Sequence, residues 1–261
     1  MRLPEQLPAP TFWPAFSLCA SIGALPSSAG DRIWQRKEDG SRAYLSSDHL
    51  VLRGSAVRNH ALAIQVPDGW LLDGELIVPG GTVGDVTSAL ARKRWQDLRY
   101  VVFDVLYAGT RATSLPYRDR WAMVCERYPE HSVEVHALPQ AAMPPVPDDW
   151  EGVIGKRLDA AWSDGRSDDC VKWKRTGFLE AVIMGFEEGS GAWRGQAGKV
   201  AFGLPKPDGS LLQVGVAGGL SQAEREAFTH SPATFIGRRC LIRHYGMNRL
   251  KLRNPIFERL L

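Results

Sequence analysis

A lysine, an Asp-Gly turn and an arginine lie together in residues 37–42 (KEDGSR), between two strand-like runs. A tight turn of this kind places the amine of Lys37 near the guanidinium of Arg42. An amine with a fixed cation beside it can attack the α-phosphate of a nucleotide and hold the phosphoramidate that forms. Surface turns often have the same composition, so the alternative is an ordinary exposed turn.

Other charged and aromatic residues interrupt apolar, strand-like segments. Residues 70–78 contain Asp73 and Glu75, which are costly to bury unless another group pairs with them. Carboxylates can bind a divalent cation, lysines stabilise charge on phosphate, and an aromatic ring can stack on a base. Nucleotidyl transfer needs side chains of all these kinds. The candidates in the sequence are Arg53, Glu75, Phe103, Glu151, Lys172 and Lys174.

The order and spacing of these segments resemble the covalent nucleotidyltransferase superfamily, which comprises ATP-dependent DNA ligases, RNA ligases and mRNA-capping guanylyltransferases. The matches to motifs I, Ia, III, IIIa, IV and V run in the family's order: KEDGSR (37–42), LRG (52–54), LDGELIV (72–78), VVFDVLY (101–107), EGVIGKR (151–157) and CVKWKR (170–175). The residues before motif I also resemble the lead-in of bacterial DNA ligases. The resemblance spans about residues 18–257.

The resemblance implies a role for each matching residue. Lys37 would be the lysine that ATP adenylates, and Glu151 with Glu75 would bind Mg²⁺ or Mn²⁺. Phe103 would stack on adenine, and the main chain near Gln35 would read the adenine edge. The remaining nucleotide contacts would come from side chains in four segments: Arg42, Arg53, Glu75, Arg166, Lys172 and Lys174.

Simpler roles remain open for some of these residues. Glu75 could be a turn acid, Phe103 a core residue, and Arg53 and Arg166 ordinary exposed arginines. Glu38 follows the lysine where ligases usually carry an aromatic or apolar group. The family's motif VI lacks a clear match after LRNPIFERLL (252–261), so we expect slow self-adenylation or a substitute group.

The elements around these residues predict an α+β fold with two domains. A mixed α/β nucleotidyltransferase (adenylation) domain is expected over residues 1–175, and a small OB-fold β-barrel over residues 176–261. Helical patterns occur at 56–66, 84–94, 116–127 and 221–229, with one more short helix expected within 1–30. Strands are expected at 70–78, 98–107, 133–138, 151–158, 170–175, 178–185, 199–204, 211–216 and 239–245.

Basic residues are concentrated in the second predicted domain. From residue 176 onwards there are eleven Lys and Arg against seven Asp and Glu. Such a surplus suits a phosphate backbone, so a DNA-binding surface is expected at Arg238, Arg239, Arg243, Arg249 and Lys251. The alternative is a solvated strand edge. Trp193, in the glycine-rich segment 189–198, could also face nucleic acid.

The composition of the 261 residues is ordinary for a globular protein, with 44% hydrophobic and 23% charged residues. No segment approaches the roughly 18 apolar residues of a membrane span, so no membrane partner is expected. Residues 12–25 read as a folded segment rather than a secretion signal. The four cysteines are far apart without a C-x-x-C pair, so no structural zinc site is expected. The absence of a secretion signal predicts reduced, separately buried thiols and a cytoplasmic protein.

Together these features predict an ATP-dependent DNA ligase that seals nicks in duplex DNA as a monomer. An RNA ligase, a capping-type nucleotidyltransferase and a non-catalytic nick- or end-binding protein are the alternatives. The sequence does not decide between replication, repair and end joining, or between a bacterial and a phage origin.

Overall fold

The computed structural model describes residues 7–9, 13–54, 57–248 and 251–261. The chain divides into two compact units, Met1–Trp173 (unit 1) and Lys174–Leu261 (unit 2). None of the helices in the described ranges is long and apolar enough to cross a membrane.

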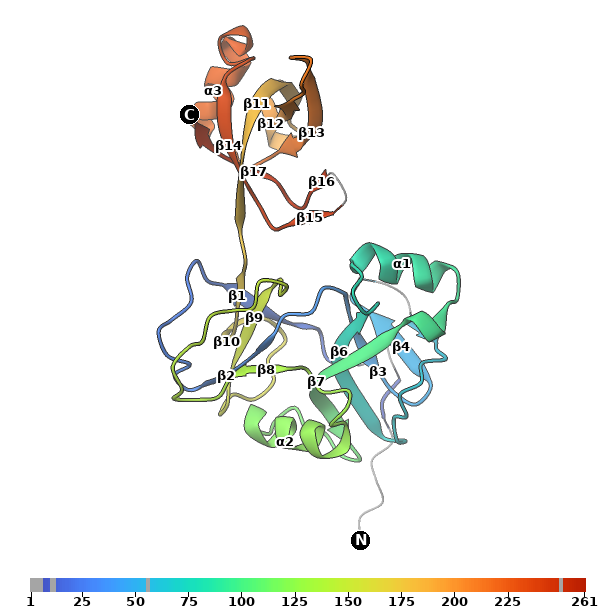
Figure 1. The fold of residues 1–261 in the computed structure, drawn as a ribbon. Coiled ribbons are helices and arrows are strands. Elements are labelled where there is room, and N and C mark those ends of the chain that lie inside the picture. Colours follow the sequence, from blue (N-terminus) through green and yellow to red (C-terminus); the bar gives the residue numbers. More distant parts are fainter. Residues whose placement is uncertain (1–6, 10–12, 55–56, 249–250) are drawn as a thin grey trace. The chain divides into compact units, whose positions relative to one another are not determined.

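The first sheet of unit 1 contains the strand before the lysine turn together with strands from both ends of the unit (Figure 1). Its strand order is β1 (Ser17–Ser21), β10 (Gly165–Lys174), β9 (Gly152–Arg157), β2 (Arg32–Arg36) and β8 (Val135–Ala137). β1 is parallel to β10, and β2 is antiparallel to both β9 and β8. The pairing of β2 with β9 joins segments more than a hundred residues apart in the sequence.

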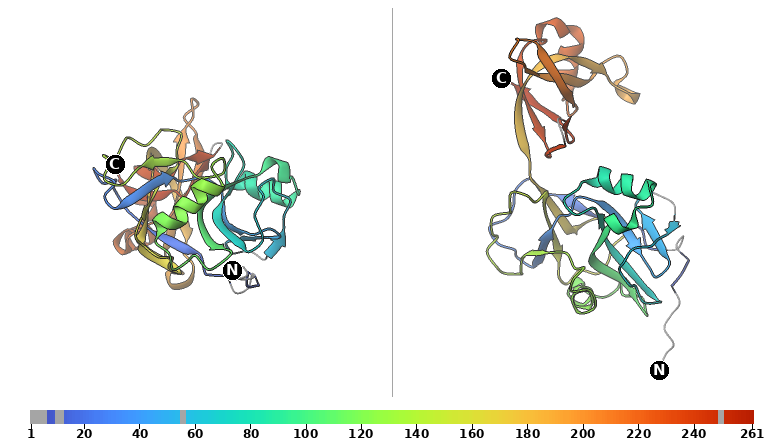
Figure 2. Two further views of the ribbon diagram at one scale, coloured as in Figure 1. Left: turned by 90° about the horizontal axis from the view of Figure 1, so that it is seen from below. Right: turned by 45° about the vertical axis from the view of Figure 1, so that its right-hand side comes forward.

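The second sheet of unit 1 holds most of the apolar core. Its order is β5 (Val57–Asn59), β4 (His49–Leu52), β3 (Ser41–Leu45), β6 (Trp70–Ile77) and β7 (Arg99–Ala108), and all neighbours are antiparallel. Helix α1 (Val83–Ala91) packs against β6, and α2 (Tyr117–Arg127) packs along β7 (Figure 2). The helices bury Val86, Ala89, Trp121 and Val124 in the core, which matches the 3.6-residue period of their apolar positions.

Unit 2 contains a five-stranded antiparallel sheet and one α-helix. The strand order is β13 (Leu211–Ala217), β12 (Ala197–Pro205), β11 (Gly177–Glu188), β14 (Arg239–His244) and β17 (Ile256–Leu260), and a two-stranded ribbon joins β15 (Met247–Asn248) to β16 (Lys251–Leu252). Helix α3 (Gln222–His230) begins with the predicted capping box, in which Ser221 and Glu224 satisfy each other's backbone amides.

Most predicted elements are confirmed to within a few residues, but two helices are wrong. Described residues 57–66 contain strand β5 and an extended segment, because Ile64 and Val66 alternate into the core with the period of two that extended chain requires. No α-helix lies in the described part of 1–30, where β1 instead pairs with β10.

The predicted β-barrel is not established by the strand pairing. In the described residues the sheet order of unit 2 runs from β13 to β17 without a ladder that closes it into a ring. A single parallel bridge between Gly218 and Ile256 joins the two ends of this order.

Candidate active site

The lysine turn connects the two sheets of unit 1. Lys37 directly follows β2, and its backbone amide donates to the carbonyl of Gly152 across the β2–β9 ladder (2.9 Å). The turn ends at Gly40, where a Cβ would lie 2.2 Å from the carbonyl oxygen of Leu76. Only glycine allows so close an approach of the turn to β6.

The register of β2 and β9 places Glu151 beside the amine of Lys37. Arg36 is opposite Val153, so the residues that follow β2 and precede β9 meet at the same edge. Lys37 Nζ donates to the carboxylate of Glu151 and to the carbonyl of Glu38 (3.1 Å). The Glu38 carboxylate lies 3.6 Å from Arg36 Nε, so its charge is partly offset by that guanidinium. The structure therefore brings together two residues that are 114 positions apart.

A buried ion pair holds Arg42 on β3. Its guanidinium donates to both carboxylate oxygens of Asp73 on β6 (3.0 and 2.6 Å) and also to the carbonyl of Ser17. The expectation that the acids in this apolar strand need a partner is confirmed for Asp73, whose residue is fully buried. Burial by itself would lower the pKa of Arg42, but the contacts with Asp73 outweigh it and raise the pKa above its ordinary value.

Glu75 lies opposite Arg42 in the β3–β6 ladder. Burial raises the pKa of its carboxyl to about 7, although the charges of Lys37 and Arg42 act to lower it. Glu151 is also close enough to raise this pKa. The arrangement thus concentrates two carboxylates and two cations around the end of the lysine turn.

These two carboxylates are the residues that fit a divalent cation. No cluster of three or more His, Cys, Asp or Glu suited to a metal is found within the described ranges. Magnesium commonly binds one or two carboxylates and takes its other ligands from water and substrate phosphates. Glu75 and Glu151 therefore match that incomplete kind of protein site.

The half-buried ring of Phe103 on β7 faces two cations. Lys156 Nζ lies 4.5 Å and the Arg42 guanidinium 5.3 Å from the ring centroid. Gln35, on β2, is buried, and its side-chain amide donates to the hydroxyl of Tyr117 (2.9 Å). The structure therefore places the Phe103 ring close to Arg42. It holds the Gln35 side chain by a hydrogen bond to Tyr117.

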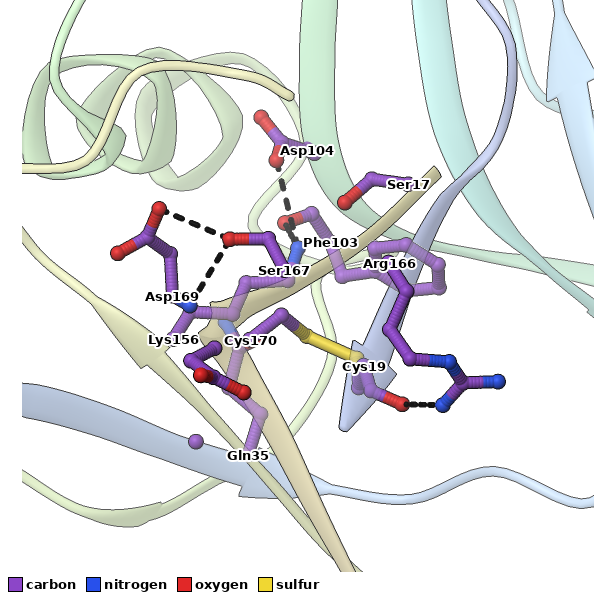
Figure 3. Close-up of a disulfide and its surroundings, with 12 residues drawn as sticks. Ser17, Cys19, Gln35, Phe103, Asp104, Lys156, Arg166, Ser167, Asp169 and Cys170 are labelled. Atoms are coloured by element: carbon purple, nitrogen blue, oxygen red, sulfur yellow. Dashed lines mark hydrogen bonds and ion pairs between the residues drawn. A yellow bond between two sulfur atoms is a disulfide. The ribbon is translucent and has the colours of Figure 1, made fainter. Parts of the chain in front are cut away.

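A disulfide between Cys19 and Cys170 joins β1 to β10. The prediction of separate reduced thiols is therefore wrong for these two residues, because the parallel pairing of β1 with β10 brings their Cα atoms to 4.4 Å. Cys125 and Cys240 are free. Figure 3 shows Phe103, Lys156 and Gln35 among the residues around the disulfide.

The predicted phosphate-binding cations lie on β10 next to this disulfide. Lys172 and Lys174 are half-buried and two positions apart, so they point to the same face of the strand. Lys174 Nζ lies 5.6 Å from the ring centroid of Tyr245. Arg166 is exposed and donates to the carbonyl of Cys19 (2.9 Å), a contact that is visible in Figure 3.

The remaining predicted cations follow β4 or belong to unit 2. Arg53 is exposed after β4. In unit 2, Arg239 pairs with Glu180, Arg243 Nε pairs with Glu258 (2.8 Å), and the Arg238 guanidinium lies 5.9 Å from the centroid of Phe235. Arg249 lies outside the described residues, and Lys251 belongs to β16.

Sequence reasoning missed the partners of the predicted residues. Asp73, which holds Arg42, was noted only as a buried acid, and Lys156, which contacts Phe103, was not selected. Lys156 lies within the matched segment EGVIGKR, and the alternation of β9 indicates which of its residues share a face. The signal that could have identified Lys156 was its charge within a largely apolar strand.

No protein-family model matches the chain. It is 30% identical over 218 residues to the multifunctional non-homologous end joining DNA repair protein LigD of Mycobacterium tuberculosis, which covers 75% of this chain and 28% of LigD. It is 25% identical over 245 residues to DNA ligase C1 of Mycolicibacterium smegmatis, covering 77% of this chain and 67% of that ligase. The chain thus spans little more than a quarter of the LigD relatives.

A solved structure from work on DNA binding by Lig E DNA ligases shares the fold. It covers 95% of this chain and 99% of its own, with a TM-score of 0.72 and 23% identity. Mycobacterial DNA ligase D complexed with ATP and MES matches with a TM-score of 0.50 and 21% identity, over 95% of each chain. By sequence and by fold, the chain is therefore a relative of the bacterial DNA ligases.

Proposed function

We propose that the chain is the catalytic core of an ATP-dependent DNA ligase that seals nicks in duplex DNA, with Lys37 as its nucleophile. The observation that carries this proposal is the meeting of Lys37 with Glu151, while Glu75, Arg42 and Phe103 surround the same turn. A surface lysine would not need a partner supplied by a strand from the other end of the unit. The relationship to LigD and ligase C1 supports the same reaction.

In the first step, Lys37 Nζ attacks the α-phosphorus of ATP. A phosphorus–nitrogen bond forms, the bond to the β-phosphate oxygen breaks, and pyrophosphate leaves. The ion pair with Glu151 fixes the amine at the end of β2 before ATP arrives. It must then open and the ammonium must lose a proton, because only the neutral amine has a lone pair for the attack.

The AMP group then moves to the 5′-phosphate at the nick, and the 3′-hydroxyl displaces it to complete the phosphodiester bond. Phe103 stacks on adenine and Arg42 faces the sugar, held by Asp73 in a single orientation. Lys172 and Lys174 on β10 neutralise the α-phosphate. A bound Mg²⁺, held by Glu75 and Glu151, would neutralise further phosphate charge.

For unit 2 we propose an OB-type module that binds the DNA backbone. The bridge between Gly218 and Ile256 supports this, since it brings the two outer strands of the sheet order together as barrel closure requires. Arg238, Arg239 and Arg243 lie on or beside β14 and supply the positive charge. Trp193, which is 42% exposed with Arg225 stacked at 4.5 Å, offers a further surface for nucleic acid.

The cellular compartment does not follow from the cysteines. The sequence argument for the cytoplasm started from the absence of a secretion signal and took reduced thiols as the consequence, and the Cys19–Cys170 disulfide contradicts that consequence. Disulfides persist mainly in oxidising compartments.

We expect the protein to act as a monomer on nicked duplex DNA.

The decisive experiment is covalent labelling by ATP. With Mg²⁺ and ATP labelled in the α-phosphate, the unmodified chain should form a stable protein–AMP adduct, and Lys37→Ala should form none. Lys199→Ala, which removes an exposed lysine that pairs with Glu187, is the matched control and should label normally. An equal stable adduct in Lys37→Ala would assign the nucleophile elsewhere.

Sealing assays identify the reaction and its strand. Nicked DNA should be sealed in the presence of ATP, with nicked RNA and GTP as the comparisons. An RNA ligase would prefer the RNA nick, and a capping-type enzyme would label with GTP. A chain that binds nicks but forms no adduct would be a non-catalytic binding protein.

A further inference from the structure

A buried cluster of charged and polar side chains lies where the two sheets of unit 1 meet. Asp104 comes from β7 of the second sheet, and Lys156 and Gln35 come from β9 and β2 of the first. Helix α2 adds Arg120 and Tyr117. The catalytic steps above give no role to Asp104, Lys156, Arg120 or Tyr117.

Asp104 is the centre of this cluster. Its carboxylate accepts hydrogen bonds from Arg120 Nε (2.8 Å), from Lys156 Nζ (3.3 Å) and from the backbone amide of Val105 (2.9 Å). Asp104 is 1% and Arg120 3% exposed. Burying charges is unfavourable even when they are paired, and an apolar cluster of equal volume would stabilise the fold as well. The retained charges therefore point to a task other than stability.

The cluster converges on one backbone group, the carbonyl of Phe103. The hydroxyl of Tyr117 donates to it (2.7 Å), and so does Lys156 Nζ (3.1 Å). Two donors use both lone pairs of the oxygen and leave the main chain beneath the aromatic ring little freedom.

Lys156 also contacts the ring itself. Its Nζ lies 4.5 Å from the ring centroids of both Phe103 and Tyr117, within the range of a cation–π interaction. The same ammonium thus holds the ring, the carbonyl behind the ring and the neighbouring Asp104. No other described side chain makes all three contacts.

Gln35 connects this cluster to the nucleophile. Its amide donates to the Tyr117 hydroxyl (2.9 Å), and it lies on β2 two residues before Lys37. The path from Lys37 to Phe103 follows the main chain of β2 to Gln35 and then two hydrogen bonds, from Gln35 to Tyr117 and from Tyr117 to the carbonyl of Phe103. It therefore fixes the distance between the amine and the aromatic ring.

We propose that Lys156 is a positioning residue for the nucleotide, which sets the Phe103 ring against adenine at the correct distance from Lys37. The inference deepens the proposed function and rests on it. An aromatic ring that is already fixed before ATP binds reduces the conformational entropy lost on binding. Releasing the ring should therefore weaken ATP binding more than it slows the attack of Lys37 on ATP.

The test measures adduct formation by the full chain as a function of ATP concentration, with Mg²⁺ present. Lys156→Met keeps the length of the side chain and removes the ammonium. We expect the half-saturating ATP concentration to rise about tenfold while the maximal rate falls less than about threefold. Lys199→Met, the exposed control, should change neither value. An unchanged half-saturating concentration in folded Lys156→Met overturns the proposal.

A double-mutant cycle with Phe103→Ala separates positioning from a general structural role. If Lys156 acts through the ring, Lys156→Met should have at most about a twofold further effect once the ring is absent. An equal tenfold effect in both backgrounds overturns the proposal. Lys156→Arg, which keeps a cation and a donor, should return the half-saturating concentration to within about threefold of the unmodified chain.

Two further measurements keep the outcome decisive. If Lys156→Met fails to show a cooperative melt, Tyr117→Phe removes the other donor to the Phe103 carbonyl at nearly constant volume, and it should raise the half-saturating ATP concentration several-fold. No change in Tyr117→Phe then overturns the proposal.

If the unmodified chain forms no adduct, the proposed function fails. The positioning role is then tested by itself, by comparing the equilibrium binding of ATP to the unmodified chain and to Lys156→Met.

Discussion

The two units use charged residues in opposite ways. In unit 1, Asp73, Asp104 and Arg120 are almost completely buried, and each is held by partners from other elements. In unit 2, Arg239 with Glu180 and Arg243 with Glu258 are exposed pairs between neighbouring strands. Buried pairs have one geometry and fail if one partner is lost, whereas exposed pairs are weak and exchange partners easily.

This difference matches what each unit is proposed to bind. Lys37, Arg42 and Phe103 have to meet one nucleotide in one orientation, which favours rigid, buried support. Arginines that bind a DNA backbone have to leave a carboxylate and take up a phosphate, which favours exposed and weak pairs. The following experiments test that contrast, beginning with the largest expected effect.

Truncating Asp104 should have the largest effect on stability. Asp104→Ala leaves Arg120 and Lys156 without their shared carboxylate, and we expect a loss of about 4 kcal/mol in the free energy of unfolding. Chemical denaturation of the full chain measures it. Glu258→Ala, which removes the acid from an exposed pair in unit 2, is the matched control and should cost less than about 1 kcal/mol. Similar losses in both variants would remove the contrast between the units.

Reducing the disulfide should be the next largest effect. Cys19 and Cys170 are 151 residues apart, so the bond strongly restricts the unfolded chain. Cys19→Ser with Cys170→Ser should lower the free energy of unfolding by about 3 kcal/mol. Reductant should destabilise the unmodified chain and leave the double variant unchanged. Equal sensitivity of both to reductant would show that another thiol is responsible.

The half-buried carboxyl of Glu75 should make stability depend on pH. Its pKa of about 7 in the folded chain exceeds its ordinary value of 4.5, so the folded state binds the proton more tightly. The resulting stabilisation is present below about pH 4.5 and is lost as the pH rises through 7. Glu75→Gln cannot titrate, so it should lack the decline of about 3 kcal/mol that the unmodified chain shows over that window. Parallel pH profiles of the two chains would contradict this assignment.

Changes to the exposed arginines should have the smallest effect on folding. Arg243→Ala should alter the free energy of unfolding by less than about 1 kcal/mol. If Arg243 binds a phosphate, the same variant should reduce the dependence of DNA affinity on salt by about one released counterion. Binding titrations at several salt concentrations measure that slope, and Lys206→Ala, a change at an exposed turn lysine of unit 2, is the comparison. An unchanged slope in Arg243→Ala would remove it from the DNA surface.

The residue patterns predicted most of the strands and three of the five expected helices well because those patterns are local. The apolar run in residues 98–107 and the capping box at Ser221 depend only on neighbouring residues. The helix expected at 56–66 failed because its apolar residues alternate into the core of a sheet whose other strands come from elsewhere in the chain. Tertiary packing overrode a weak local preference there.

The sequence by itself determined which residues could do chemistry: a lysine before an Asp-Gly turn, acids within apolar strands and lysines alternating along another. Only the tertiary structure decided which of them meet. The register of β2 and β9 sets Glu151 beside Lys37, the pairing of β3 with β6 brings Asp73 to Arg42, and the pairing of β1 with β10 joins Cys19 to Cys170. The physical reason is that strand pairing between segments distant in the sequence is fixed by the burial of whole sheet faces, which no short segment encodes.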